Sequence, residues 1–181
     1  MESLLILVKE RKQMAKENYD LILKQILKYE GGKVDHKDDP GGRTAYGITQ
    51  ATYDAWRKSN NQSSADVFNI SMVDVKAIYK QQYWDKINGD NLPSGIDMAV
   101  MDYAVNSGVS RAARTLQGVV GVSQDGQIGP ATIQATKDYV AMTVTNKRLA
   151  FMQSLSIWST FGKGWSARIT DVKNQILALT K

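Results

Sequence analysis

The sequence predicts a mainly α protein with a glycine-rich loop near its N-terminal end and at most a small β-hairpin. Two observations favour this fold class. Apolar residues recur at helical spacing along most of the 181-residue chain, and glycines and prolines separate the periodic stretches. A β-like bias is confined to RTAYGIT, residues 43–49. The length suits one domain, or one with a small second lobe, and is enough to bury a core.

The first predicted helix covers residues 2–29 and is interrupted near Asn18. Its buried face is expected to carry an apolar series at helical spacing: Tyr19, Ile22, Leu23, Ile26 and Leu27. Glu30 continues the series, at a position where the pattern calls for an apolar side chain. Gly31 and Gly32 follow directly and predict the end of the helix.

A loop with short strands is predicted over residues 33–49, and two helices follow it. The stretch TQATYDAWRK predicts a helix with Thr49 as its N-cap. Ser71, with Asp74 three residues later, has the spacing of a capping box and predicts the start of a third helix that ends at Tyr83.

The stretch LPSGIDMAVMDYAVNSG, residues 92–108, predicts the buried centre of the fold. Its helix leaves no polar face, and a helix that is apolar all round is usually surrounded by other elements. Gly108 ends this helix. The remaining predicted helices cover residues 110–119, a segment that starts at Pro130, residues 138–158 and residues 165–179.

The composition excludes several kinds of chemistry. The chain has no cysteine and a single histidine, His36, so disulfides, thiol catalysis and a zinc site built from several histidines are excluded. Neither G-x-S-x-G nor G-x-x-x-x-G-K-[ST] occurs, which argues against serine-hydrolase and nucleotide chemistry. Carboxylates remain as the acid–base groups, and we expect no metal and no cofactor.

The charge balance favours an anionic partner. Lys and Arg number 23 and Asp and Glu number 18, which gives a formal net charge of +5. That surface suits nucleic acid, an anionic membrane face or an anionic cell-wall polymer, and the charge does not choose among them. The sequence shows no nucleic-acid recognition motif and no basic–aromatic cluster, so we expect no nucleic-acid partner.

The N-terminal stretch MESLLILVKERKQMAKEN has five consecutive strongly apolar residues before a charge cluster. A secretory signal needs an apolar core of roughly 7–15 residues behind a positive start. No stretch reaches the ~18 apolar residues of a membrane span. We therefore expect synthesis in the cytoplasm without a signal peptide, and no stable membrane insertion.

Glu30 is the candidate general acid. Its place in an apolar stripe and at the negative end of a helix dipole favours the protonated form of its carboxyl group. Glycosidic bond cleavage needs such a proton donor and a second carboxylate. Asp35, Asp38 and Asp39 are available, and Asp39 is preferred because Pro40-Gly41-Gly42 predicts a tight turn after it. Thr44 is a candidate for positioning water. The alternative interpretation is a solvated last-turn glutamate followed by an ordinary turn.

The stretch EGGKVDHKDDPGGRTAYGIT resembles the signature of the glycoside hydrolase family 108 N-acetylmuramidases. These are phage endolysins and bacterial relatives, some of them labelled secretion activators. The family pattern is approximately E-G-G, a short loop, D-x-G-G-x-T and x-x-G-I-T. The matching residues are Glu30, Gly31, Gly32, Asp39, Gly41, Gly42, Thr44, Gly47, Ile48 and Thr49.

The resemblance implies a lysozyme-like helical fold and cleavage of the β-1,4 bond between N-acetylmuramic acid and N-acetylglucosamine. It implies Glu30 as the catalytic acid. Phage-type lysozymes, a looser resemblance, space their glutamate and aspartate as Glu30 and Asp39 are spaced, whereas Thr44 comes one residue early. Lys33 departs from the family pattern, which commonly has an aromatic residue there.

The second half resembles the predicted peptidoglycan-binding region that usually follows this signature. The matching stretches are YW (83–84), DYAVNSG (102–108), LQ (116–117), DGQIGPAT (125–132) and GWSARI (164–169). We therefore expect an N-terminal extension helix over 1–18, a lysozyme-like catalytic region over 19–92 and a helical region over 93–181. The last two are expected to pack as one compact unit.

Three residues are candidates for sugar binding: Tyr46 and Tyr103 by stacking, and Asn106 by hydrogen bonding. Asp102 and Asn106, one helical turn apart, are interpreted either as caps of a neighbouring element or as part of a cleft floor. Gln117 and DGQIGP are expected to be structural. The tryptophans at 84, 158 and 165 are expected in the core.

The sequence therefore predicts a monomeric muramidase whose partners are peptidoglycan glycan strands. It would act in the periplasm or cell wall after release through a holin pore or a dedicated export route. Two alternatives stay open. A lytic transglycosylase would also use one glutamate but leave 1,6-anhydro ends. A non-catalytic wall-binding secretion helper would bind sacculi without turnover.

Overall fold

The computed structural model describes residues 17–35, 42–137 and 139–180. Most of the predicted N-terminal extension helix lies outside these residues, as do His36, Asp38 and Asp39. Residues 17–30 form an uninterrupted helix, so the predicted break near Asn18 does not occur within the described part. Asn18 is accommodated there because its amide donates to the Ser94 hydroxyl at 2.9 Å and to the Asp97 carboxylate at 2.8 Å.

The chain forms two compact units. The small unit is Leu23–Gln82, and the large unit combines Met1–Ile22 with Tyr83–Lys181. These limits differ from the predicted ones, which fell after residues 18 and 92. Part of the reason is local packing in the large unit. The ring centroids of Tyr19 and Trp84 lie 5.2 Å apart, so the helix around Tyr19 packs with the segment after Gln82.

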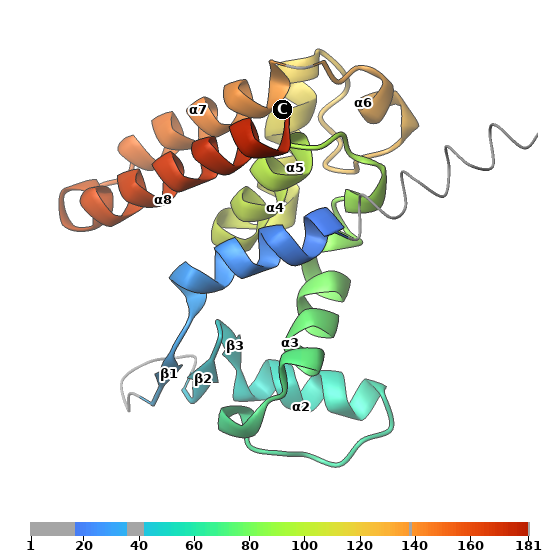
Figure 1. Cartoon of the computed structure of the whole chain (residues 1–181), viewed down its shortest axis with the longest axis vertical. Helices are drawn as coiled ribbons and strands as arrows, with labels where there is room; N and C mark the ends of the chain where they lie inside the picture. Colours follow the sequence, from blue (N-terminus) through green and yellow to red (C-terminus); the bar gives the residue numbers. More distant parts are fainter. Residues whose placement is uncertain (1–16, 36–41, 138, 181) are drawn as a thin grey trace, which may run out of the picture. The chain divides into compact units, whose positions relative to one another are not determined.

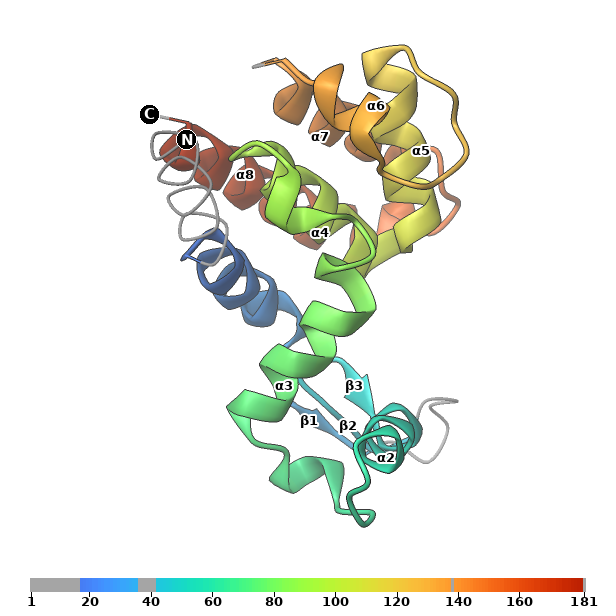
Figure 2. The same cartoon turned by 90° about the vertical axis from the view of Figure 1, so that its right-hand side faces the viewer.

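The small unit contains a three-stranded antiparallel sheet of very short strands. β1 is Lys33–Val34, β2 is Thr44–Ala45 and β3 is Ile48–Thr49, in the order β1-β2-β3. Ala45 pairs with Lys33 on one side and with Ile48 on the other. Figure 2 shows the strands side by side next to α2 (Gln50–Ser59). The predicted hairpin is therefore present, extended by one strand.

The two predicted N-caps of the small unit are confirmed. The Thr49 hydroxyl accepts from the Thr52 N–H at the start of α2, at 3.2 Å. The Ser71 hydroxyl accepts from the Asp74 N–H at the start of α3 (Met72–Tyr79), at 3.1 Å. A short 3-10 helix, η1 (Val67–Asn69), precedes α3, and a π-helix, η2 (Lys80–Trp84), follows it. Regular α-helix thus ends at Tyr79, before the predicted Tyr83.

The large unit is helical. Its elements are η3 (Gly89–Asn91), α4 (Ile96–Ser107), α5 (Val109–Val120), α6 (Pro130–Gln134), α7 (Val140–Gln153) and α8 (Trp158–Leu179). Helix α4 packs against α5, α7 and α8, and residues 96–104 are all buried, which confirms its predicted central place. Helices α7 and α8 run side by side (Figure 1). Among the described helices, none combines the length and apolar character needed to cross a membrane.

Helix α8 begins at Trp158, seven residues before the predicted start at 165. Gly162 lies inside this helix and serves packing, because a Cβ there would lie 2.7 Å from the Trp158 indole. Trp84 is fully buried, as predicted. The core prediction was wrong for Trp158 and Trp165, which are half-exposed and pack on each other along α8 at a 6.0 Å centroid distance.

Gln117 has the structural role that the sequence predicts. Its buried side chain donates to the Gln127 carbonyl oxygen at 3.0 Å and accepts from the Gly126 N–H at 2.9 Å. It also donates to the Asp125 carboxylate at 2.6 Å. These bonds fasten the turn between α5 and α6 to α5.

Candidate active site

Glu30 ends an anchored helix and remains half-exposed. The preceding residues of its apolar stripe are buried: Tyr19, Ile22, Leu23 and Ile26. The close packing at Gly31 leaves no room for a larger residue, because a Cβ there would lie 2.6 Å from the Leu27 carbonyl oxygen. Gly32 then turns the chain with a φ of +110°. The Glu30 carboxyl group is therefore held by a fixed backbone and is more open to solvent than its stripe predicted.

A two-residue turn, Tyr46–Gly47, joins β2 to β3 and lies against Glu30. Both residues have positive φ, 53° and 72°, as a type I′ hairpin turn requires. A Cβ at Gly47 would lie 3.3 Å from the Cβ of Glu30 and 3.5 Å from its Oε2. The turn thus forms a wall beside the carboxyl group, and this close approach depends on glycine at position 47.

The turn is tied to its surroundings through the backbone of Tyr46. Its N–H donates to the Gly32 carbonyl oxygen at 3.2 Å, two residues after Glu30. Its carbonyl oxygen accepts from the Tyr79 hydroxyl at 2.9 Å. The sequence pattern did not identify Tyr79, because it lies on the apolar face of α3 and is indistinguishable there from an ordinary core residue. Tyr46 itself is half-exposed.

Thr44 lies in β2, half-buried, and its hydroxyl donates to the Gly42 carbonyl oxygen at 3.1 Å. The hydroxyl proton is thereby engaged, and the lone pairs of the hydroxyl oxygen can accept a hydrogen bond from water. The structure places Glu30, Thr44 and Tyr46 in the small unit. Asp39, the predicted second carboxylate, lies outside the described residues.

Arg43 connects both ends of the loop that carries Asp39. Its guanidinium donates to Asp35 at 2.9 Å and to Asp66 at 2.8 Å, and it lies 3.9 Å from the centroid of the Phe68 ring. The hydrogen bond from the Phe68 N–H lowers the pKa of the Asp66 carboxyl group most, and the hydrogen bond from Arg43 lowers it further. These ion pairs are exposed, so each contributes little to stability. Asp35, one of the three candidate second carboxylates, is engaged in this cluster.

The family model described as glycosyl hydrolase 108 matches residues 23–108. Among solved structures, Brucella abortus SagA is similar at 40% sequence identity and a TM-score of 0.77, over 92% of this chain and 97% of that chain. This chain belongs to the glycosyl hydrolase 108 family. A search of curated proteins finds no match.

Membership in the glycosyl hydrolase 108 family confirms the predicted enzyme class, glycoside hydrolase. The similarity to SagA also agrees with the predicted mainly α, lysozyme-like fold class. The family match begins at residue 23, within the helix that ends in Glu30, and includes the sheet, the turn and α3 with Tyr79. The site geometry described above therefore lies wholly within the matched segment.

The other predicted sugar contacts of this family 108 chain belong to the large unit. Asn106 is exposed, and its amide oxygen accepts from the Ser107 hydroxyl at 3.0 Å. Tyr103 is only 2% exposed and lies under the Arg148 guanidinium, 5.6 Å from the ring centroid. Such burial does not support stacking of Tyr103 on a sugar. Asp102 is neither a cap nor part of a cleft floor, because it pairs with two buried arginines.

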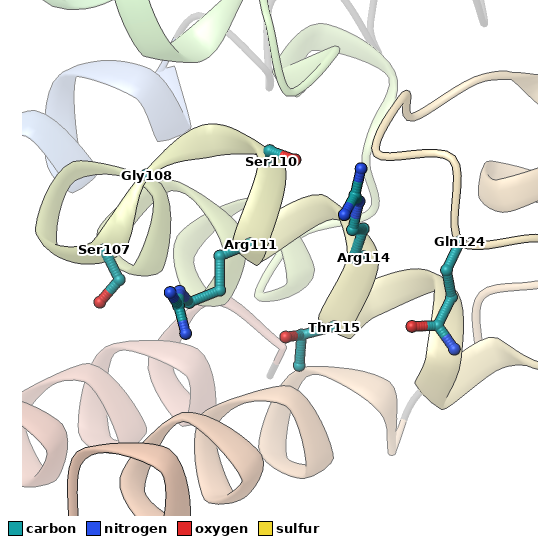
Figure 3. Close-up of a pocket in the computed structure, with 7 residues that line it drawn as sticks. All are labelled: Ser107, Gly108, Ser110, Arg111, Arg114, Thr115 and Gln124. Atoms are coloured by element: carbon teal, nitrogen blue, oxygen red, sulfur yellow. The ribbon is translucent and has the colours of Figure 1, made fainter. Parts of the chain in front are cut away.

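A surface hollow of about 480 Å³ in the large unit is lined by residues of α4, α5 and the loop after α5. Figure 3 shows that its two arginines, Arg111 and Arg114, leave α5 in opposite directions. The guanidinium group of Arg111 lies over the Phe151 ring, 4.2 Å from its centroid. The charged groups therefore do not converge on one ligand, and the hollow is a weaker candidate than the Glu30 site. Over residues 17–35, 42–137 and 139–180, no group of three or more acidic or histidine side chains could hold a metal ion.

Proposed function

We propose that this family 108 chain is a peptidoglycan hydrolase, an N-acetylmuramidase that cleaves the β-1,4 bond between N-acetylmuramic acid and N-acetylglucosamine. One observation carries the proposal. Glu30 presents a half-exposed carboxyl group at the end of an anchored helix, with the Tyr46–Gly47 turn against it, inside the segment that matches the family. A carboxyl group so held can protonate the leaving glycosidic oxygen.

The remaining roles follow from the chemistry of the step. Glu30 donates the proton, and Asp39 stabilises the oxocarbenium-like charge or activates water. Thr44 positions that water with its hydroxyl lone pairs, since its proton is directed to the Gly42 carbonyl oxygen. Tyr46, next to the turn glycine, is the proposed stacking surface for a sugar ring, and Asn106 is a proposed further contact.

The proposed substrate is the glycan strand of peptidoglycan, and the formal charge of +5 favours that anionic polymer. We propose a monomer that is made in the cytoplasm and reaches the periplasm or cell wall through a holin pore or a dedicated export route. Neither nucleic acid nor stable membrane insertion has a place in this function.

The test is mass analysis of the products that purified Gram-negative sacculi release after digestion. Wild type is expected to produce reducing muramic-acid ends. Glu30→Gln should lower the rate about 10²–10⁴-fold, because it removes the general acid but keeps the shape of the side chain. Asp39→Asn should lower it as well, and the size of that loss measures the contribution of the second carboxylate.

Glu17→Gln is the matched control, because it makes the same chemical change at an exposed position of the same helix, away from Glu30. It should retain the wild-type rate. Products with 1,6-anhydro ends would replace the proposal with a lytic transglycosylase. Binding to sacculi without any release of products would replace it with a non-catalytic wall-binding protein. Equal rates for Glu30→Gln and wild type would remove Glu30 from its role.

A further inference from the structure

Tyr79 is a buried residue whose hydroxyl group bonds to the turn beside Glu30. It is the last residue of α3 and is 2% exposed, next to Val75 and Ile78, which are fully buried. Its hydroxyl donates to the Tyr46 carbonyl oxygen at 2.9 Å, across 33 positions of sequence. The ring thus belongs to the core, while the hydroxyl group ties α3 to the hairpin.

The residue that Tyr79 holds is in an unfavourable backbone conformation. Tyr46 has a φ of 53°, a left-handed value that a non-glycine residue adopts only at a cost. Both polar groups of its backbone are engaged: the N–H donates to the Gly32 carbonyl oxygen, and the carbonyl oxygen accepts from Tyr79. These two bonds, which we call the Tyr46 clamp, oppose the tendency of the turn to relax.

The turn and the Tyr79 hydroxyl meet the Glu30 side chain at one point. The position of a Cβ on Gly47 is 2.9 Å from the Tyr79 hydroxyl oxygen, 3.3 Å from the Cβ of Glu30 and 3.5 Å from its Oε2. Glu30 and Tyr79 therefore both pack against the α-carbon side of Gly47. A displacement of the turn would change the space in which the carboxyl group of Glu30 can rotate.

We propose that Tyr79 is a positioning residue for Glu30. Through the Tyr46 clamp it fixes the turn, and the turn holds the Glu30 carboxyl group in the orientation from which it can protonate the glycosidic oxygen. This inference rests on the proposed function. Catalysis depends steeply on such placement, since an error of about 1 Å can cost about 10²-fold in rate.

The test compares Tyr79→Phe with Tyr53→Phe in the full chain. Tyr53 is the control, because it is also 2% exposed, lies in the same unit and has a hydrogen-bonded hydroxyl group, which donates to Asp74 at 2.8 Å and accepts from Arg57 at 3.1 Å. Both changes remove one hydroxyl group from a buried ring. Kinetics are measured on purified uncrosslinked glycan strands, with reducing ends as the readout and at a temperature below both unfolding midpoints.

Tyr79→Phe is expected to lower kcat about 10- to 100-fold and to change KM by a smaller factor, because the turn that it fixes also carries Tyr46, the proposed stacking residue. Both variants should lower the thermal unfolding midpoint by similar amounts, because each removes a hydrogen-bonded hydroxyl group from a buried ring. Tyr53→Phe should nevertheless keep the wild-type kcat. In a Glu30→Gln background, Tyr79→Phe should cause no further loss, because Tyr79 acts through the carboxyl group that is then absent.

The clamp has a second readout that does not need catalysis. NMR heteronuclear NOE values of the Tyr46 and Gly47 amides should fall in Tyr79→Phe and stay unchanged in Tyr53→Phe. Unchanged values in Tyr79→Phe would overturn the clamp. If the wild type is active and Tyr79→Phe keeps the wild-type kcat, the positioning role of Tyr79 is overturned and the proposed function stands. A wild type that hydrolysed no glycan would overturn the proposed function, and the positioning role with it.

Discussion

Gly47 shows how the absence of a side chain can decide the chemistry of a neighbouring carboxyl group. Its φ of +72° is accessible to glycine at little cost. Its open Cβ position lies 2.9 Å from the Tyr79 hydroxyl and 3.5 Å from the Glu30 Oε2. A methyl group there would collide with the hydroxyl and press on the carboxyl side chain. Glycine at position 47 is therefore a condition for the site, and not only for the turn.

Gly47→Ala is expected to lower kcat by more than about tenfold, because the added methyl group displaces the turn or rotates Glu30. It should also lower the free energy of unfolding, since a left-handed alanine costs roughly 1–2 kcal/mol. Reducing-end release and urea unfolding measure the two effects.

Gly121→Ala separates the backbone strain from the collision. Gly121 ends α5 with a φ of +77°, and no heavy atom lies within 4 Å of its Cβ position. The control should lose about 1 kcal/mol of stability and keep its activity. If the two variants retained the same kcat, close packing of Gly47 on Glu30 would not matter for catalysis.

Single-residue roles were predictable where a local pattern carries them. Glu30 interrupts an apolar series just before two glycines, and that can be seen in the sequence alone. Tyr79 and Tyr103 both lie among apolar residues in helices, so their patterns are alike. The structure gives one a hydrogen bond to the Tyr46 carbonyl oxygen and buries the other under Arg148. Such differences depend on partners far along the chain.

Three helices of the large unit meet at a buried cluster of charges. Asp102 of α4 pairs with Arg148 of α7 and with Arg168 of α8, the latter at 2.9 Å, and the three side chains are at most 6% exposed. Burial by itself raises the pKa of the Asp102 carboxyl group, but the two guanidinium groups outweigh burial and hold the pKa below its ordinary value. One carboxylate thus serves two cations.

Asp102→Asn is expected to destabilise the protein by about 4 kcal/mol, because it leaves two buried guanidinium groups without their counter-charge. Arg148→Met should cost less, since it leaves Asp102 and Arg168 as a balanced pair. In the described part of the chain, the Nε and Nη2 atoms of Arg148 are buried without a hydrogen-bond partner, so their removal relieves an existing cost.

Urea unfolding of both variants decides between a shared ion cluster and independent pairs. Arg148→Met as unstable as Asp102→Asn would show that the carboxylate needs both arginines. The elements that meet here were largely predictable as helices from their spacing. Their pairing was not, because Asp102 looks like any polar residue in an apolar helix until α7 and α8 are placed against it.

At the scale of the whole molecule, Asp97 links stability to pH. It lies in the first turn of α4, 1% exposed, and accepts from the Asn18 amide at 2.8 Å and the Met98 N–H at 2.7 Å. Burial raises the pKa of its carboxyl group from 3.8 to about 6, although hydrogen bonds from Asn18, Met98 and Gly95 oppose the rise. The folded protein therefore binds this proton more tightly than the unfolded chain.

The stability that this proton contributes is fully present below about pH 4 and is lost as the pH rises through about 6. The shift corresponds to about 3 kcal/mol at most. We expect the wild-type free energy of unfolding to fall across this window, and Asp97→Asn to remove most of that fall. Urea unfolding of both proteins at pH 4.5 and 7.5 gives the comparison.

Two other carboxyl groups, those of Asp66 and Asp125, act outside this window. The pKa values of Asp66 and Asp125 are lowered, chiefly by backbone N–H groups. Their contribution to stability is therefore lost only as the pH falls below the ordinary pKa of an aspartate, 3.8. A parallel fall in wild type and Asp97→Asn would show that Asp97 does not titrate in this window.

The sequence by itself determined the helical fold class, the two N-caps of the small unit, the central place of α4 and the candidate acid Glu30. These depend on periodicity, caps and glycine stops within a few residues of one another, and such local preferences survive without knowledge of the fold. Only the tertiary structure decided the clamp between Tyr79 and Tyr46, the partners of Asp102, the burial of Tyr103 and the start of α8 at Trp158. The first three depend on contacts between segments that are far apart in the sequence, and the start of α8 depends on the space that Gly162 leaves for the Trp158 ring. Local sequence patterns do not encode such contacts, because they form only when the chain is folded.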